Sequence, residues 1–112
     1  MNPRHQELAA RLRGEIPRLE QIFQRALRSW PRAHASFPDH EAYLDSVALN
    51  LHGFYSGVER LLELIARQVD QALPAGETWH RDLLRRMSEE MSQVRPAVIG
   101  KESALTLDQF RQ

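Results

Sequence analysis

The side chains of this 112-residue sequence that could ligate a metal or transfer a proton are chiefly its five histidines. His34 and His40 lie six residues apart around a proline-containing stretch, with Asp39 beside the second. Without a third ligand, an HExxH motif or a Cys/His cluster, such a pair does not predict a metal site. His52 and His80 could each serve as an acid or base, although hydrogen-bonded structural histidines also explain both positions.

Other familiar catalytic motifs are missing from the sequence. It contains no cysteine and no G-x-S-x-G, P-loop or G-x-G-x-x-G motif. This excludes thiolate chemistry and the usual hydrolase and nucleotide-binding sites, so no cofactor is predicted. The lack of cysteine suits a reducing compartment. Because there is no apolar leader and no run of about 18 apolar residues, we expect a cytoplasmic protein without a membrane-spanning segment.

The charges are balanced overall but unevenly distributed. Residues 1–33 contain seven arginines and three acidic residues, whereas residues 34–77 contain two arginines and seven acidic residues. Two interpretations remain open: the first segment binds an anionic partner, or oppositely charged helices pack side by side. Lys101 is the only lysine. The preference for arginine suits bidentate phosphate recognition, but a codon bias would produce the same composition.

Helices must position these side chains, because apolar residues recur at intervals of three and four along almost the whole chain. The first helix is predicted from about Pro3 to about Trp30. It should be kinked or split near Pro17 and ended by Pro31, since proline removes a backbone hydrogen bond and restricts the residue before it. The predicted core stripe of this helix is Leu8, Leu12, Ile16, Leu19, Phe23, Ala26, Leu27 and Trp30.

Two further helices follow. The second is predicted from an N-cap at Asp39 to about Ala72 and is the most apolar. The third is predicted from an N-cap at Thr78 to about Val94, with Pro96 beyond its end. Their predicted core positions are Tyr43, Val47, Ala48, Leu51, Phe54, Tyr55, Val58, Leu61, Leu62, Ile65, Val69, Leu83, Leu84, Met87, Met91 and Val94.

A fourth helix is predicted to begin at Thr106, which forms a capping box with Gln109. Only six residues follow the cap, fewer than a stable isolated helix needs. Short connections favour antiparallel neighbours, so we expect a single all-α domain over residues 1–112: an up-and-down bundle of three main helices plus the start of a fourth. We also expect this domain to be incomplete at its C-terminus, with exposed apolar surface that absent residues or another chain would cover.

The second helix carries two patterns that invite interpretation. Gly53 and Gly57 lie four residues apart, which predicts close approach of a neighbouring helix in preference to a ligand notch. Tyr55, Glu59 and Glu63 share one side of the same helix. We expect a solvated face there; the alternative is a recognition patch in which the acids are partly buried against arginine.

Four segments, LHGFYSGVERLLELIA, LPAGETWHRDLLRRM, RPAVI and LDQFR, occur in an order that resembles the HepT-like family of the HEPN superfamily. The similarity extends from about Leu49 to the end, and its most specific parts are the Phe-Tyr-x-Gly-x-Glu-Arg core and Trp79-His80. The resemblance implies a compact helical homodimer that acts as a metal-independent endoribonuclease, the toxin of a bacterial toxin-antitoxin module. The implied partner is a nucleotidyltransferase antitoxin, which in some pairs adenylylates a tyrosine.

The ribonuclease motif of that superfamily is an arginine, four to six residues and a histidine on a late helix. Arginine can stabilise the charge on the scissile phosphate, while histidine transfers protons. The one literal match runs from Arg28 to His34, and we reject it because Pro31 should interrupt the helix between them. The resemblance places the motif beyond Gln112, with Arg111 the only weak candidate in the chain. We therefore expect residues 1–112 to be inactive as a ribonuclease; the alternative function is a non-catalytic helical binding module that dimerises or pairs with a nucleotidyltransferase.

Overall fold

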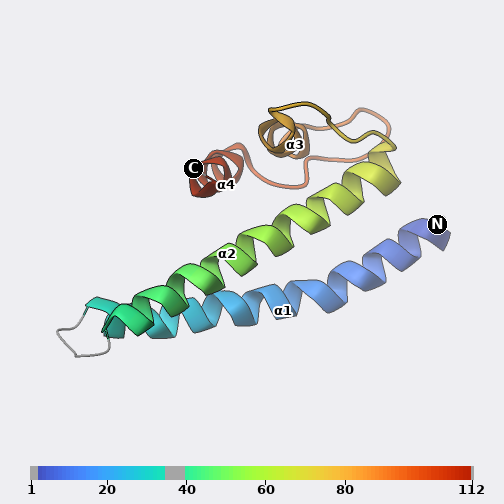
Figure 1. Ribbon diagram of the computed structural model, residues 1–112. Coiled ribbons are helices and arrows are strands. Elements are labelled where there is room, and N and C mark those ends of the chain that lie inside the picture. Colours follow the sequence, from blue (N-terminus) through green and yellow to red (C-terminus); the bar gives the residue numbers. More distant parts are fainter. Residues whose placement is uncertain (1–2, 35–39, 112) are drawn as a thin grey trace. The chain divides into compact units, whose positions relative to one another are not determined.

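The computed structural model describes residues 3–34 and 40–111, and its regular elements are helical (Figure 1). They are α1 (Pro3–His34), α2 (His40–Ile65), a π-helical turn η1 (Ala66–Asp70) directly after α2, α3 (Trp79–Met87) and α4 (Lys101–Arg111). In the described ranges the only extended pairing is an isolated bridge between Met91 and Arg95. The prediction of an all-α fold is therefore confirmed.

Two compact parts make up the chain, and each is described by itself. The hairpin unit comprises Ala10–Val58, and the C-terminal unit comprises Met1–Ala9 with Glu59–Gln112. A single domain over residues 1–112 stays a prediction. Within the described residues, no helix contains a stretch long and apolar enough to cross a membrane.

In the hairpin unit, α1 and α2 run antiparallel. The rings of Phe23 and Phe54 lie with their centroids 5.4 Å apart, and Leu19, one turn earlier on α1, faces Gly57, one turn later on α2. A Cβ at Gly57 would overlap the Leu19 side chain, whereas a Cβ at Gly53 would meet nothing within 4 Å. Close helix approach is thus confirmed for Gly57 and wrong for Gly53.

The first helix is longer than predicted. It continues through Pro17 as one helix and passes Pro31 to end at His34, so the predicted end at Pro31 is wrong. Pro31 lies in the final turn, where the loss of one backbone hydrogen bond does not stop three more residues from staying helical. The Asp39 cap predicted for α2 lies outside the described residues.

Much of the predicted core stripe of α1 is exposed. Two packed helices shield only the side chains along their line of contact, so residues at the edges of the stripe stay in solvent. The buried members are Leu8, Leu19 and Ala26, and the exposed ones are Ile16, Phe23, Leu27 and Trp30.

The C-terminal unit has the better-formed core. Its buried apolar residues are Leu8, Leu62, Ile65, Ala66, Leu83, Leu84, Met87 and Ala104. An ion pair joins η1 to the connection after α3: Arg95 Nε donates to Asp70 Oδ1 at 2.6 Å, and Arg95 Nη2 donates to Asp70 Oδ2 at 2.7 Å. These side chains are 6% and 0% exposed. Since a buried charge must be neutralised, this bidentate pair fixes the connection against η1.

The predicted end of α3 near Val94 is wrong, because the helix stops at Met87. The Ser88 hydroxyl donates to the Arg85 carbonyl at 2.6 Å, an alternative to continued helical bonding that serine commonly offers. The N–H groups of Val98 and Ile99 then both donate to the Met87 carbonyl, at 2.9 and 3.2 Å. Val94, predicted to be in the core, is exposed.

The predicted start of α4 at Thr106 is also wrong. The helix begins at Lys101, and the Ala104 N–H already donates to the Gly100 carbonyl at 3.0 Å. The Thr106 hydroxyl donates to the Glu102 carbonyl one turn earlier, at 3.0 Å, so it bonds within the helix. Thr106 is an interior residue, and the capping box is not formed.

Candidate functional site

The histidine with the best-defined surroundings is His80, the second residue of α3. Its Nδ1 lies 2.7 Å from Oε2 of Glu59 on α2, and the two side chains are 28% and 14% exposed. The Trp79 ring lies against the imidazole with its centroid 3.6 Å away. His80 is therefore the hydrogen-bonded, partly buried histidine expected from the sequence. The solvated face predicted for Glu59 is wrong, because a histidine of α3 covers it.

Such a pair orients an imidazole, but cleavage of a phosphodiester also needs a positive group at the phosphate. No histidine of this sequence has an arginine three, four or seven residues away. These are the spacings that put two side chains on one face of a helix. The described helices therefore hold no Arg/His pair on a shared face. His52 lies on an exposed part of α2.

The literal match from Arg28 to His34 needs correction. Both residues belong to α1, so the premise that Pro31 separates them is wrong. The match is still rejected, because it lies on the first helix whereas the motif belongs to a late helix; six residues along an α-helix also separate the two positions by about 120° of rotation. The side chains of His34, His40 and Arg111 lie outside the described residues, although Arg111 is the last residue of α4. Among the described side chains, no three His, Asp or Glu residues gather as metal ligands.

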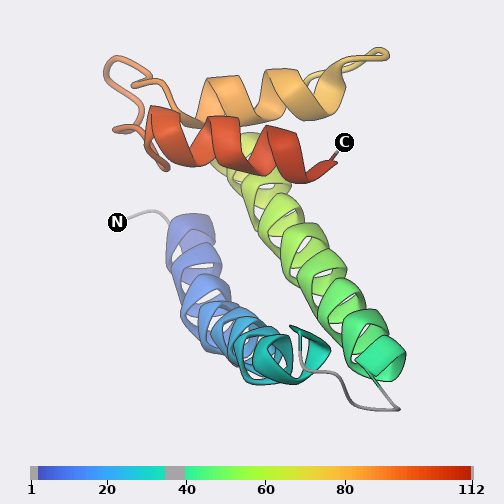
Figure 2. The same cartoon turned by 90° about the vertical axis from the view of Figure 1, so that its left-hand side faces the viewer.

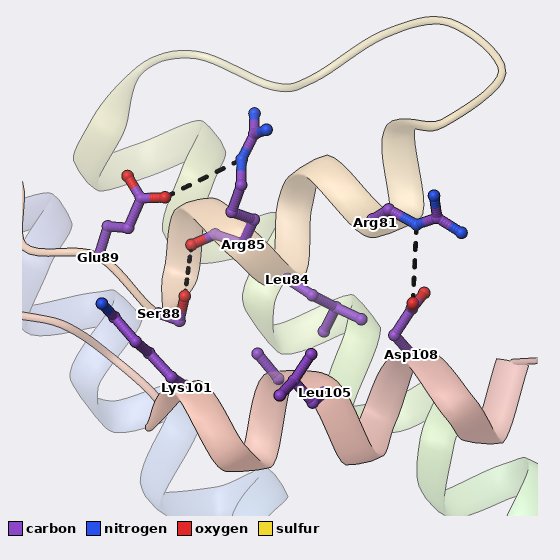
Figure 3. A pocket seen from close by; sticks show the side chains of 9 residues that line it. Arg81, Leu84, Arg85, Ser88, Glu89, Lys101, Leu105 and Asp108 are labelled. Atoms are coloured by element: carbon purple, nitrogen blue, oxygen red, sulfur yellow. Dashed lines mark hydrogen bonds and ion pairs between the residues drawn. The ribbon is translucent and has the colours of Figure 1, made fainter.

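A second candidate is a groove of about 490 Å³ between α3 and α4. The two helices run antiparallel (Figure 2): Arg81, near the start of α3, pairs with Asp108, near the end of α4, at 3.6 Å. Leu84 and Leu105 point into the groove from opposite walls (Figure 3). Its lining is completed by Arg85, Ser88, Glu89, Lys101 and Ala104.

The rim of the groove is polar and slightly basic. Three cations, Arg81, Arg85 and Lys101, face two carboxylates, and Arg85 Nε lies 3.9 Å from Glu89 Oε1. An apolar floor with a charged rim suits the docking of an amphipathic segment. The described lining of the groove contains no histidine. The groove was not predicted from the sequence, because the predicted helix start at Thr106 placed Lys101 and Ala104 in a loop, whereas both belong to α4.

In a comparison with known protein families, a model of the HepT-like protein family matches residues 46–112. That range is more than half of the chain. The chain belongs to the HepT-like family. The resemblance noted from about Leu49 onward is confirmed, with a start three residues earlier. No curated protein and no solved structure matches the chain.

Both candidate sites lie inside the HepT-like match. It contains Glu59 and His80, and it contains both walls of the α3–α4 groove. The first helix lies outside it. The groove and the His80–Glu59 pair are thus features of the HepT-like part of the chain, whereas the arginines of α1 need a separate explanation.

Proposed function

We propose that this HepT-like chain is the toxin component of a bacterial toxin-antitoxin module, with RNA as the substrate that the toxin cleaves. The observation that carries the proposal is the family match over residues 46–112. The proposed reaction is metal-independent, with an arginine stabilising the charge on the phosphate and a histidine transferring protons.

The chemistry is proposed to need residues besides those described for the 112-residue chain. His80 is engaged with Glu59, and no arginine lies five to seven residues before His80 or His52. We therefore expect the purified 112-residue protein to leave RNA intact. Robust cleavage that is lost in His80→Ala or His52→Ala would contradict this assignment.

The natural gene provides the test of the toxin assignment. Its coding sequence should be read past the codon for Gln112, together with the neighbouring gene. The natural product should then be expressed in bacterial cells with and without that neighbour. Growth arrest with fragmented RNA, relieved by a neighbouring nucleotidyltransferase, is the expected result. Unimpeded growth with intact RNA at high expression would refute the toxin assignment.

A non-catalytic binding module is the second candidate, and the α3–α4 groove favours it. Leu105 lines the groove with 67% of its surface exposed, and Phe110 on the same helix is 56% exposed. Exposed apolar groups beside a charged rim are typical of interaction surfaces. A second copy of the chain or a nucleotidyltransferase is the proposed partner. Light scattering after size exclusion should show a dimer or a complex that Leu105→Ser weakens; a monomer in both mixtures would exclude this candidate.

A further inference from the structure

Arginines recur along α1 at a fixed interval. Among the described side chains of the hairpin unit, the members of this seven-residue series are Arg11, Arg18 and Arg25. Seven residues are nearly two helical turns, so successive members rotate by only about 20° around the helix. At 1.5 Å per residue the three Cα atoms span about 21 Å. We call these three residues the arginine row.

The arginine row is open to solvent and weakly neutralised. All three residues are exposed. Glu15 approaches Arg18 to 3.9 Å, but these side chains are 40% and 76% exposed, and such surface pairs contribute little. Arg25 borders a polar depression lined also by Pro17, Glu20, Gln21, Gln24 and Arg28. Its amide and guanidinium groups are hydrogen-bond donors, and Glu20 contributes one carboxylate.

The row is not explained by packing of α1 against α2. The residues of α1 that face α2, Leu19 and Phe23, lie about 80° or more around the helix from every member of the row. The α2 part of the hairpin unit, residues 40–58, carries two acids, Glu41 and Asp45, and no arginine or lysine. Positive charge therefore gathers on one helix of the unit without a complementary row facing it in the described contacts.

We propose that the arginine row binds the phosphate backbone of RNA. A line of evenly spaced guanidinium groups about 21 Å long matches a polymer with regularly spaced phosphates better than a compact ligand does. Each planar guanidinium can bind a phosphate with two parallel hydrogen bonds. This inference rests on the proposed function for its choice of RNA, but it concerns a surface outside the HepT-like match. The row holds RNA and performs no chemistry.

The size of the effect follows from counterion release. Each phosphate contact on a single strand contributes about 0.7 to the slope of log K against log salt. Three contacts then contribute about two units of slope, which is about a hundredfold in affinity at 0.1 M salt. Removing the row should lower affinity and salt dependence together.

The experiment compares two triple variants of equal charge by fluorescence anisotropy with a labelled single-stranded RNA. One carries Arg11→Gln, Arg18→Gln and Arg25→Gln. The matched control carries Arg13→Gln on another face of α1, with Arg60→Gln and Arg67→Gln on exposed positions further along the chain. Circular dichroism of both proteins checks that they stay helical. A polyglutamate of similar length serves as the competing polyanion.

The expected result is about a hundredfold weaker RNA binding and a slope smaller by about two for the row variant, with a much smaller loss for the control. Equal losses in both variants, no RNA binding by the unmodified protein, or equally tight row-dependent binding of polyglutamate would each overturn the inference. RNA binding that depends on the arginine row, without growth arrest, would support the role of the row and refute the toxin function. Growth arrest by the natural product together with unchanged RNA binding in the row variant would support the toxin function and refute the role of the arginine row.

Discussion

Replacing each of the two helical glycines of α2 by alanine should have opposite effects on stability. Alanine is favoured over glycine by about 0.8 to 1 kcal/mol in a helix interior. At Gly53 the new methyl group meets nothing within 4 Å, so the full gain should appear. Gly53→Ala is expected to raise the free energy of unfolding by about 1 kcal/mol, with a rise in Tm of about 4 °C.

At Gly57 the same methyl group would overlap Cδ2 of Leu19. Leu19 is buried, so its side chain or the helix must move, and overpacking of this kind costs about 1 to 3 kcal/mol. After subtraction of the helical gain, Gly57→Ala should change stability by between about zero and a loss of 2 kcal/mol. The two variants should therefore differ by about 1 to 3 kcal/mol.

Urea denaturation followed by far-ultraviolet circular dichroism measures both values. The overlap can be tested directly by repeating the two substitutions in a Leu19→Val background, which removes the terminal methyl groups. There Gly57→Ala should approach Gly53→Ala in effect, and the difference between backgrounds gives the coupling energy. If Gly57→Ala stabilises the original protein as much as Gly53→Ala does, α1 does not pack closely on Gly57 and the reasoning fails.

Two further substitutions test the C-terminal unit. Asp70→Asn leaves the buried Arg95 guanidinium without its countercharge and should lower the free energy of unfolding by about 3 to 5 kcal/mol in chemical denaturation. The control, Glu89→Gln in the exposed pair with Arg85, should cost less than about 1 kcal/mol. Similar losses in both variants would mean that the Asp70–Arg95 pair is not buried. Thr106→Ala removes a hydroxyl that bonds inside α4, to the Glu102 carbonyl, and should be neutral or stabilising by up to about 0.7 kcal/mol in thermal melts. A loss of about 1 kcal/mol would indicate a helix cap at Thr106 instead.

The presence of helices was predictable from this sequence, because the recurrence of apolar residues at intervals of three and four is a local property of the chain. The ends of the helices were less predictable, because contacts with distant segments of the chain determine them. The end of α3 at Met87 is only partly a local matter: Ser88 bonds to the nearby Arg85 carbonyl, but Arg95 pairs with Asp70, which is 25 residues away. Thr106 with Gln109 has the local signature of a helix start, yet α4 begins five residues earlier.

The candidate sites show the same division. His80 was recognisable as a hydrogen-bonded histidine, but its partner Glu59 is 21 residues away, so no spacing rule finds it. The groove was missed because it depends on the true start of α4. Gly53 and Gly57 are both glycines of α2, so the sequence alone does not separate their roles. Only the position of Leu19 on α1 shows that Gly57 lies at a close helix contact and Gly53 does not.

The connection between α3 and α4 is held at several points, and this bears on how the groove would bind. Arg95 Nη1 donates to the carbonyls of Glu89 and Pro96 at 2.9 and 3.0 Å, while the N–H groups of Val98 and Ile99 return to Met87. The connection has thus already lost its conformational freedom in the folded chain. A partner that binds between α3 and α4 therefore meets two helices whose relative position is already fixed. The conformational entropy of ordering the connection is lost during folding, so it does not reduce the affinity of binding.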